Sequence, residues 1–163
     1  MDKNYLYAVA NIRANELSLL SRADIDALID APDYKTALTL LDGKGYDTSF
    51  GSDYSAMLDG ETEKTWSLIK SVAPSAEALD IFIVKNDFQN LKAVLKSEKT
   101  GDDAEKYLVS PSVIPKELLL KAVKERDFDA LPDFISGAAE KCLEVITKTE
   151  NGQLCDIAAD RAG

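Results

Sequence analysis

The chain has 163 residues, of which 45% are hydrophobic and 29% charged, a composition typical of a folded protein rather than a disordered one. Its 19 basic and 29 acidic side chains give a formal net charge of −10, which excludes a general nucleic-acid binder and electrostatic adsorption to an anionic membrane. The absence of histidine excludes histidine-based triads and zinc sites, and two cysteines, Cys142 and Cys155, are too few for a disulfide framework. No uncharged stretch is long enough to insert directly into lipid.

Leucine and alanine outnumber valine and isoleucine, and the hydrophobic pattern is helical along the whole chain, so we expect an all-α fold. The predicted helices cover residues 5–20, 22–30, 34–42, 53–72, 75–98, 116–126 and 132–148. A last helical segment begins near residue 153 and stops at 161, as if the chain were cut inside a longer protein; a natural frayed end is the alternative. The first helix is apolar on most of its surface, so we expect it to be buried at the centre of the fold.

A weak internal repeat relates residues 25–34 to residues 119–128. Each segment has the pattern of a short helix, then an acidic residue followed by an aromatic one, then the start of another helix. This similarity indicates an array of related helical units, although a chance match between two helix–turn–helix patterns explains it equally well.

Arg13 and Asp87 are the charged residues that most need partners. Each is surrounded at helical spacing mainly by apolar residues, and a buried charge without a partner is very costly. Glu16 is the nearest candidate partner of Arg13 along its own helix. We expect Arg13 and Asp87 to form a bidentate ion pair between two central helices, with a structural role; a partner-binding or catalytic pair is the alternative.

No other residues form a recognisable chemical site. The acidic groups at 24–30 and 102–105 lack the ligand spacing of a calcium loop, so we expect them to be solvated faces. The glycines form no phosphate-binding loop, and the two cysteines have no signature of a reactive thiol. The sequence therefore predicts no catalytic residue, no cofactor and no metal site.

Several motifs together resemble a known family. Residues 5–21 read YxYAVAxIRAxExxLLS and residues 87–96 read DFxNLKAVLK, and shorter matches occur at 24–31, 37–46, 114–118 and 156–161. Their order and spacing are similar to those of the C subunit of bacterial and archaeal V/A-type ATPases, which corresponds to the d subunit of the eukaryotic vacuolar enzyme. Asn11 departs from the pattern, because many members carry a second arginine there. The resemblance adds Asn90, in the second motif, to the structural ion-pair candidates Arg13, Glu16 and Asp87.

The resemblance implies an irregular multi-helix bundle built from related helical units and incomplete at its C-terminus, since family members are about twice as long and contain three such units. Residues 1–105 would be the first unit, with central helices 5–20 and 75–98, and residues 106–163 would be part of a truncated second unit.

The resemblance also implies a non-catalytic component of the central stalk of a rotary ATPase. Such a component links the rotor-shaft subunits, of the D and F type, to the membrane rotor ring, and so couples ATP hydrolysis or synthesis to transport of protons or sodium ions. It would be peripheral, on the cytoplasmic face of the membrane, as part of the complex. The alternatives are a generic helical protein–protein adaptor and a metal hydrolase based on carboxylates.

Overall fold

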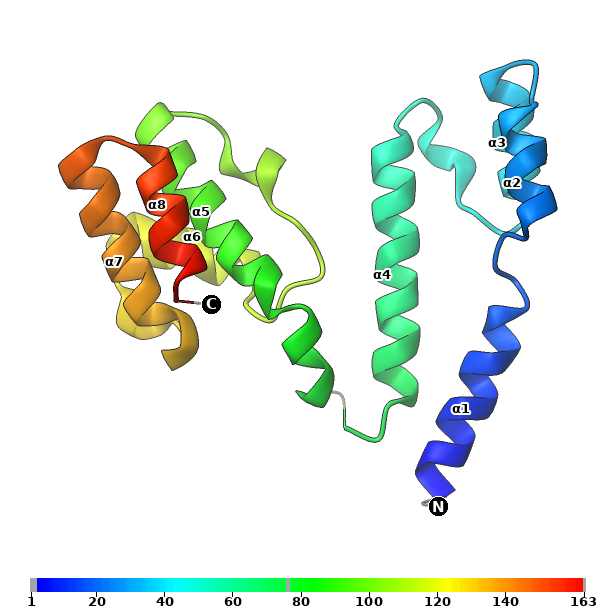
Figure 1. The fold of residues 1–163 in the computed structure, drawn as a ribbon, viewed down its shortest axis with the longest axis horizontal. Helices are drawn as coiled ribbons and strands as arrows, with labels where there is room; N and C mark the ends of the chain where they lie inside the picture. Colours follow the sequence, from blue (N-terminus) through cyan, green and yellow to red (C-terminus); the bar gives the residue numbers. More distant parts are fainter. Residues whose placement is uncertain (1–2, 76, 163) are drawn as a thin grey trace. The chain divides into compact units, whose positions relative to one another are not determined.

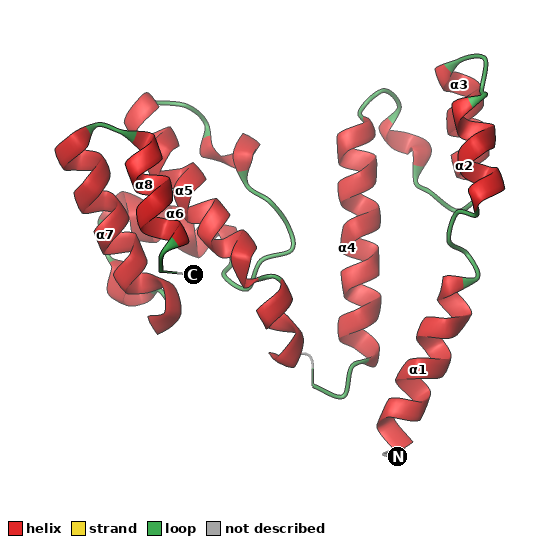
Figure 2. Cartoon of the chain, in the orientation of Figure 1, coloured by secondary structure: helices red, strands yellow, loops and turns green. Residues whose placement is uncertain are grey.

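Helices form all the regular structure in residues 3–75 and 77–162, the part of the chain that this computed structural model describes (Figure 2). No strand occurs in these residues, and the predicted all-α class is confirmed. By its internal contacts the chain divides into two compact units, Met1–Glu77 and Ala78–Gly163, which we call unit 1 and unit 2. None of the described helices is long and apolar enough to cross a membrane.

The described part of unit 1 consists of α1 (Lys3–Glu16), α2 (Arg22–Ile29), α3 (Tyr34–Asp42), the short 3-10 helix η1 (Thr48–Phe50) and α4 (Tyr54–Val72) (Figure 1). Local sequence signals set most of these boundaries. Ser21 and Asp24 form a capping box at the start of α2, as their spacing predicts, and Asp33 caps α3 through the backbone N–H of Thr36. Within unit 1, α1 packs against α4, and η1 packs against both α3 and α4.

The expectation that the first helix is buried at the centre of the fold is wrong for this structure. The exposed fraction is 56% for Leu6, 51% for Val9 and 88% for Leu17. The periodicity correctly predicts a helix here, but it does not say whether another element covers the apolar side chains of that helix. In unit 1, α4 packs against one side of α1 and leaves these side chains exposed.

Unit 2 is built around α5 (Val84–Thr100), which contacts most of the other elements of the unit. α5 contacts the 3-10 helix η3 (Ala104–Tyr107) and the helices α6 (Lys116–Glu125), α7 (Asp133–Thr149) and α8 (Gly152–Asp160). A further 3-10 helix, η4 (Phe128–Ala130), packs against α6 and α7. A continuous hydrophobic core joins them and includes the fully buried side chains of Leu91, Leu119 and Ile135. Gly101 ends α5 in the left-handed conformation (φ 79°), which glycine adopts without steric cost.

The predicted helix 75–98 is two elements in the structure. A 3-10 helix, η2 (Glu77–Phe82), comes first, and α5 begins only at Val84. The residues around this break, 81–84, are β-branched or aromatic and therefore weak helix formers, and no side chain caps α5.

The division into compact units between Glu77 and Ala78 differs from the division into helical repeats predicted at residues 105 and 106. By its contacts, α5 belongs to the second compact unit rather than to the first. Compact units and sequence repeats are different divisions of a chain, and the assignment of repeats at 1–105 and 106–163 stays a prediction.

Candidate functional site

Three polar side chains near the start of α5 hold the connecting segment 109–114 through hydrogen bonds to its backbone. They are Asn86, Asp87 and Asn90, which we call the α5 latch. Asp87 is 0% exposed and Asn90 is 1% exposed, so both polar groups lie inside unit 2. A buried polar group needs partners, and the connecting segment supplies them.

The Asp87 carboxylate accepts two hydrogen bonds from consecutive backbone N–H groups, from Val113 at 3.1 Å and from Ile114 at 2.8 Å. Burial raises the pKa of Asp87, and the hydrogen bonds from Ile114 and Val113 oppose that increase. Because Asp87 is closed to solvent and its oxygens are bonded to the chain, it orders the loop and does not meet a soluble substrate.

Both asparagines of the latch bind the connecting segment through their side-chain amides, and Asn90 uses its donor and its acceptor as a backbone would. Asn90 Nδ2 donates to the carbonyl oxygen of Val109 at 3.0 Å, and the N–H of Val109 donates to Asn90 Oδ1 at 2.8 Å. Asn86 Nδ2 donates to the carbonyl oxygen of Pro111 at 2.7 Å. An amide is suited to this task because it has both a donor and an acceptor. The latch thereby fixes the segment that leads to Ile114, a core residue, and to the start of α6.

The four ion-pair candidates divide between the two units. In unit 1, Arg13 Nη1 donates to Glu16 Oε2 at 2.7 Å, and the Arg13 side chain is 75% exposed, so Arg13 does not point into a covered apolar side. In unit 2, Asp87 and Asn90 are both members of the latch. Each predicted partner therefore has a bond within its own unit, and the ion pair between Arg13 and Asp87 stays a prediction.

Sequence reasoning identified Asp87 as a buried carboxylate that needs a donor but did not identify the donors. It also missed Asn86 and the role of residues 109–114. The available signal was the pattern Asn-Asp-x-x-Asn at 86–90 followed by a connection that contains Pro111 and Pro115. Proline has no backbone N–H, so such a connection forms fewer backbone hydrogen bonds of its own. Its remaining polar groups then need side-chain partners from a neighbouring helix.

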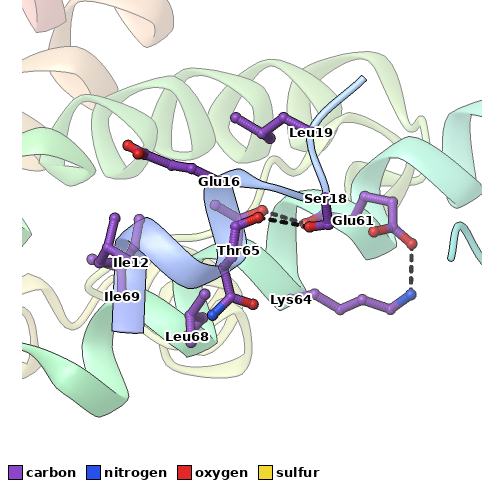
Figure 3. Close-up of a pocket in the computed structure, with 10 residues that line it drawn as sticks. Ile12, Glu16, Ser18, Leu19, Glu61, Lys64, Thr65, Leu68 and Ile69 are labelled. Carbon is purple, nitrogen blue, oxygen red and sulfur yellow. Dashed lines mark hydrogen bonds and ion pairs between the residues drawn. The ribbon is translucent and has the colours of Figure 1, made fainter. Parts of the chain in front are cut away.

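A groove of about 420 Å³ lies in unit 1 between α1 and α4 (Figure 3). Its apolar part is formed by Ile12 and Leu19 on one side and by Leu68 and Ile69 of α4 on the other. Lys64 and Glu61 form an ion pair at the groove, and the hydrogen bond from Lys64 to Glu61 raises the pKa of Lys64. Unit 1 thus has an open surface of mixed apolar and charged character.

The acidic groups of the sequence serve local structure. Asp24 takes part in the capping box and forms an ion pair with Lys44 at 2.8 Å, and these interactions lower the pKa of Asp24 to about 2. Asp103 caps η3 through the N–H of Glu105. Among the described residues, no group of three or more histidine, cysteine, aspartate or glutamate side chains is placed to hold a metal ion.

Comparison with known proteins identifies the family. A family model described as ATP synthase (C/AC39) subunit matches residues 8–163. The chain belongs to this family. A similar curated protein is the C subunit of the V-type sodium ATPase of Enterococcus hirae, which is 25% identical over 154 residues. That alignment covers 92% of this chain and 47% of the relative, so the chain spans about half the length of the curated relative that it matches. No solved structure matches the chain significantly.

The predicted resemblance to the C subunit of V/A-type ATPases is therefore confirmed. The matched region of this C/AC39 chain includes all but the first seven residues of unit 1, all of unit 2 and the whole α5 latch. Two of the three latch residues, Asp87 and Asn90, lie in the motif at 87–96, so this motif that carried the resemblance has a physical explanation. Its polar positions hold a connection, and its apolar positions Phe88 and Leu91 enter the core.

Proposed function

We propose that this chain is a non-catalytic part of the central stalk of a V/A-type rotary ATPase or ATP synthase. In this role it links the rotor shaft to the membrane ring, and it couples ATP hydrolysis or synthesis to ion transport. The observation that carries the proposal is the family match over residues 8–163, together with a relative named as the C subunit of a V-type sodium ATPase.

The construction of unit 2 supports a mechanical role. An element that transmits torque must resist deformation, and close-packed cores with satisfied buried polar groups are stiff. The core of unit 2 extends over four α-helices, and the latch ties the longest connection between them to α5. No buried side-chain nitrogen or oxygen among the described residues lacks a hydrogen-bond partner.

The surface of unit 1 supports a role in protein–protein contact. Side chains such as Leu6, Leu17 and Leu19 are exposed on and just after α1, and Leu19 also lines the groove between α1 and α4. The proposed partners are the shaft subunits, of the D and F type, and the rotor ring of the same complex. The proposed location is the cytoplasmic face of the membrane, as a peripheral component, and the proposal requires no cofactor.

Binding to the rotor-shaft subunits of the same organism tests the proposal. We expect the chain to co-elute with the purified shaft subunits in size-exclusion chromatography at micromolar concentration. An unrelated acidic helical protein of similar size serves as the control for non-specific attraction between charged proteins. The absence of a complex at micromolar concentration, with both components folded by circular dichroism, would contradict the proposal.

A matched pair of variants then locates the contact relative to the groove. Leu19→Asp changes a side chain that lines the groove, whereas Leu17→Asp changes an exposed side chain that does not line it. A larger loss of affinity for Leu19→Asp assigns the shaft contact to the groove, and equal affinities place the contact elsewhere on the chain.

A further inference from the structure

The two cysteines of the chain meet inside unit 2, although the sequence offers no motif that joins them. Cys142 lies on α7 and Cys155 lies on α8, and both are 0% exposed. The Cys142 thiol donates a hydrogen bond to the carbonyl oxygen of Cys155 at 3.6 Å, so the two residues are in direct contact. Two neighbouring cysteines can exchange with a disulfide and join to each other, which two isolated core cysteines cannot do.

The structure of the helical hairpin explains the contact. α7 ends at Thr149, Glu150 takes the left-handed conformation (φ 54°), and Asn151 caps α8, so the chain turns back directly and α8 runs beside α7 (Figure 1). Ala139 of α7 and Ala159 of α8 are both fully buried in the same core. Small side chains let the two helices approach closely, as a disulfide between them requires.

We propose that Cys142 and Cys155 are a redox modification site, at which a disulfide oxidant such as oxidised glutathione converts the two thiols into one reversible disulfide that joins α7 to α8. The chain supplies the reduced pair, and the oxidant accepts the two electrons and is itself reduced to two glutathione thiols.

The reaction balances as two consecutive thiol–disulfide exchanges. In the first, a cysteine thiolate attacks one sulfur of oxidised glutathione, a mixed disulfide forms, and glutathione thiolate leaves and takes up a proton. In the second, the other cysteine loses its proton to solvent, attacks the mixed disulfide on the protein sulfur and releases the second glutathione. Cys155 is the first nucleophile, because the neighbouring Cys142 side chain lowers the pKa of Cys155, whereas the Cys155 side chain and burial raise the pKa of Cys142.

Access of the oxidant to the buried thiols depends on how α8 is attached. Three lysines on one side of α5 form ion pairs with acidic residues of the α7–α8 turn and of α8. They are Lys92 with Asp160 at 2.8 Å, Lys96 with Asp156, and Lys99 with Glu150 at 2.8 Å. Partly exposed pairs of this kind contribute little each and are weakened by salt. The last helix is therefore the element whose transient opening exposes Cys142 and Cys155.

Intact-mass spectrometry of the full chain tests the site. After incubation of the folded, reduced protein with oxidised glutathione, we expect a species lighter by about 2 Da, which dithiothreitol reverses, without accumulation of the adduct heavier by about 305 Da. Peptide mapping should place the bond between Cys142 and Cys155. The single variants Cys142→Ala and Cys155→Ala cannot close the bond and serve as controls that lose the lighter species.

Two results would contradict the proposal that Cys142 and Cys155 form a redox modification site. One is a folded wild-type chain that keeps both thiols free while the urea-unfolded chain oxidises under the same conditions. The other is a mixed glutathione adduct that persists without conversion to the internal disulfide.

The rate of oxidation tests separately whether the oxidant reaches the two thiols through transient opening of α8. Lys96→Gln removes one ion pair between α5 and α8, so we expect it to increase the oxidation rate severalfold, as roughly 0.5 M salt should do for the wild type. Lys106→Gln, which alters an exposed pair with Asp103 far from α8 in the chain, is the matched control and should leave the rate unchanged. Equal rates for all three proteins at low and high salt would contradict the opening of α8 as the route.

Discussion

Unit 1 and unit 2 are both built from amphipathic helices joined by short connections, but they differ in what those helices cover. Among the described residues of unit 1, Met57 is the only buried hydrophobic side chain. Unit 2 has a continuous core that extends from Phe88 to Ala159. The difference shows that helix formation and core formation are separate steps. Local signals determine the helices of both units, but buried contacts between helices are extensive only in unit 2.

Hydrogen exchange should give the largest contrast between the units. Amides that lie on helices with few buried contacts open locally at low cost, whereas amides in a packed core open only with the unit. We therefore expect the amides in the middle of α5 and α7 to exchange at least about a hundredfold more slowly than those of α1 and α4 in the isolated chain. Equal protection of α1 and α5 would break the comparison.

Two leucine-to-alanine substitutions sharpen the comparison. Leu91 is 0% exposed in the core of unit 2, and its replacement by alanine should reduce the free energy of unfolding by about 3 kcal/mol, because it leaves a cavity. Leu58 is 51% exposed on α4, and Leu58→Ala should cost less than about 0.5 kcal/mol. Urea unfolding followed by far-UV circular dichroism measures both values. A similar cost at the two positions would show that α4 is buried more deeply in solution than this structure shows.

The latch makes a specific contribution to unit 2. Asp87→Ala leaves the N–H groups of Val113 and Ile114 without their acceptors, so it should destabilise the unit by about 2–3 kcal/mol in urea unfolding. Asp129→Ala, which changes an exposed aspartate of the same unit, is the control and should stay within about 0.5 kcal/mol of the wild type. A mild effect of Asp87→Ala would mean that water satisfies the connection as well as the carboxylate does.

The smallest expected effect concerns the surface of unit 1. The hydrogen bonds of Asp24 with Lys44 and Ser21 hold its pKa at about 2, below the usual value near 3.8. The ionised form is therefore favoured in the folded state, and its contribution to stability is present above the usual pKa and is lost as the pH falls through about 2. We expect a carboxyl titration by NMR to give this low midpoint, and Lys44→Gln to move the midpoint toward 3.8. An unchanged midpoint in Lys44→Gln would remove Lys44 as the cause.

Much of the helical framework could be predicted from the sequence because its signals are local. The capping box at Ser21 and Asp24, the cap at Asp33 and the glycine at position 101 act within a few residues of the helix ends that they define. The predicted range of the third helix, 34–42, agrees with α3 (Tyr34–Asp42) for the same reason. The start of α5 was predicted too early, because no side chain caps it and its first residues have weak helix propensity.

The site could be predicted only in part. The apolar surroundings of Asp87 correctly indicated a buried carboxylate, but the search for its partner considered charged side chains. The donors are backbone N–H groups of Val113 and Ile114, which carry no sequence signature and lie 26 and 27 residues away along the chain. The contact between Cys142 and Cys155 was missed for a related reason, since it depends on how α7 and α8 pack rather than on spacing.

The α5 latch also divides the connection between α5 and α6 into two stretches with different tolerance of added chain. Residues 101–103 are exposed, and the latch side chains bind only residues further along the connection. An epitope tag or a labelling sequence inserted after Asp102 therefore has room to project into solvent. The same insertion within 109–114 would separate the backbone groups that Asn90 and Asp87 bind in fixed order. A protein engineer who wishes to mark this chain inside an assembled complex therefore has a permissive position before η3 and should avoid the stretch that follows η3.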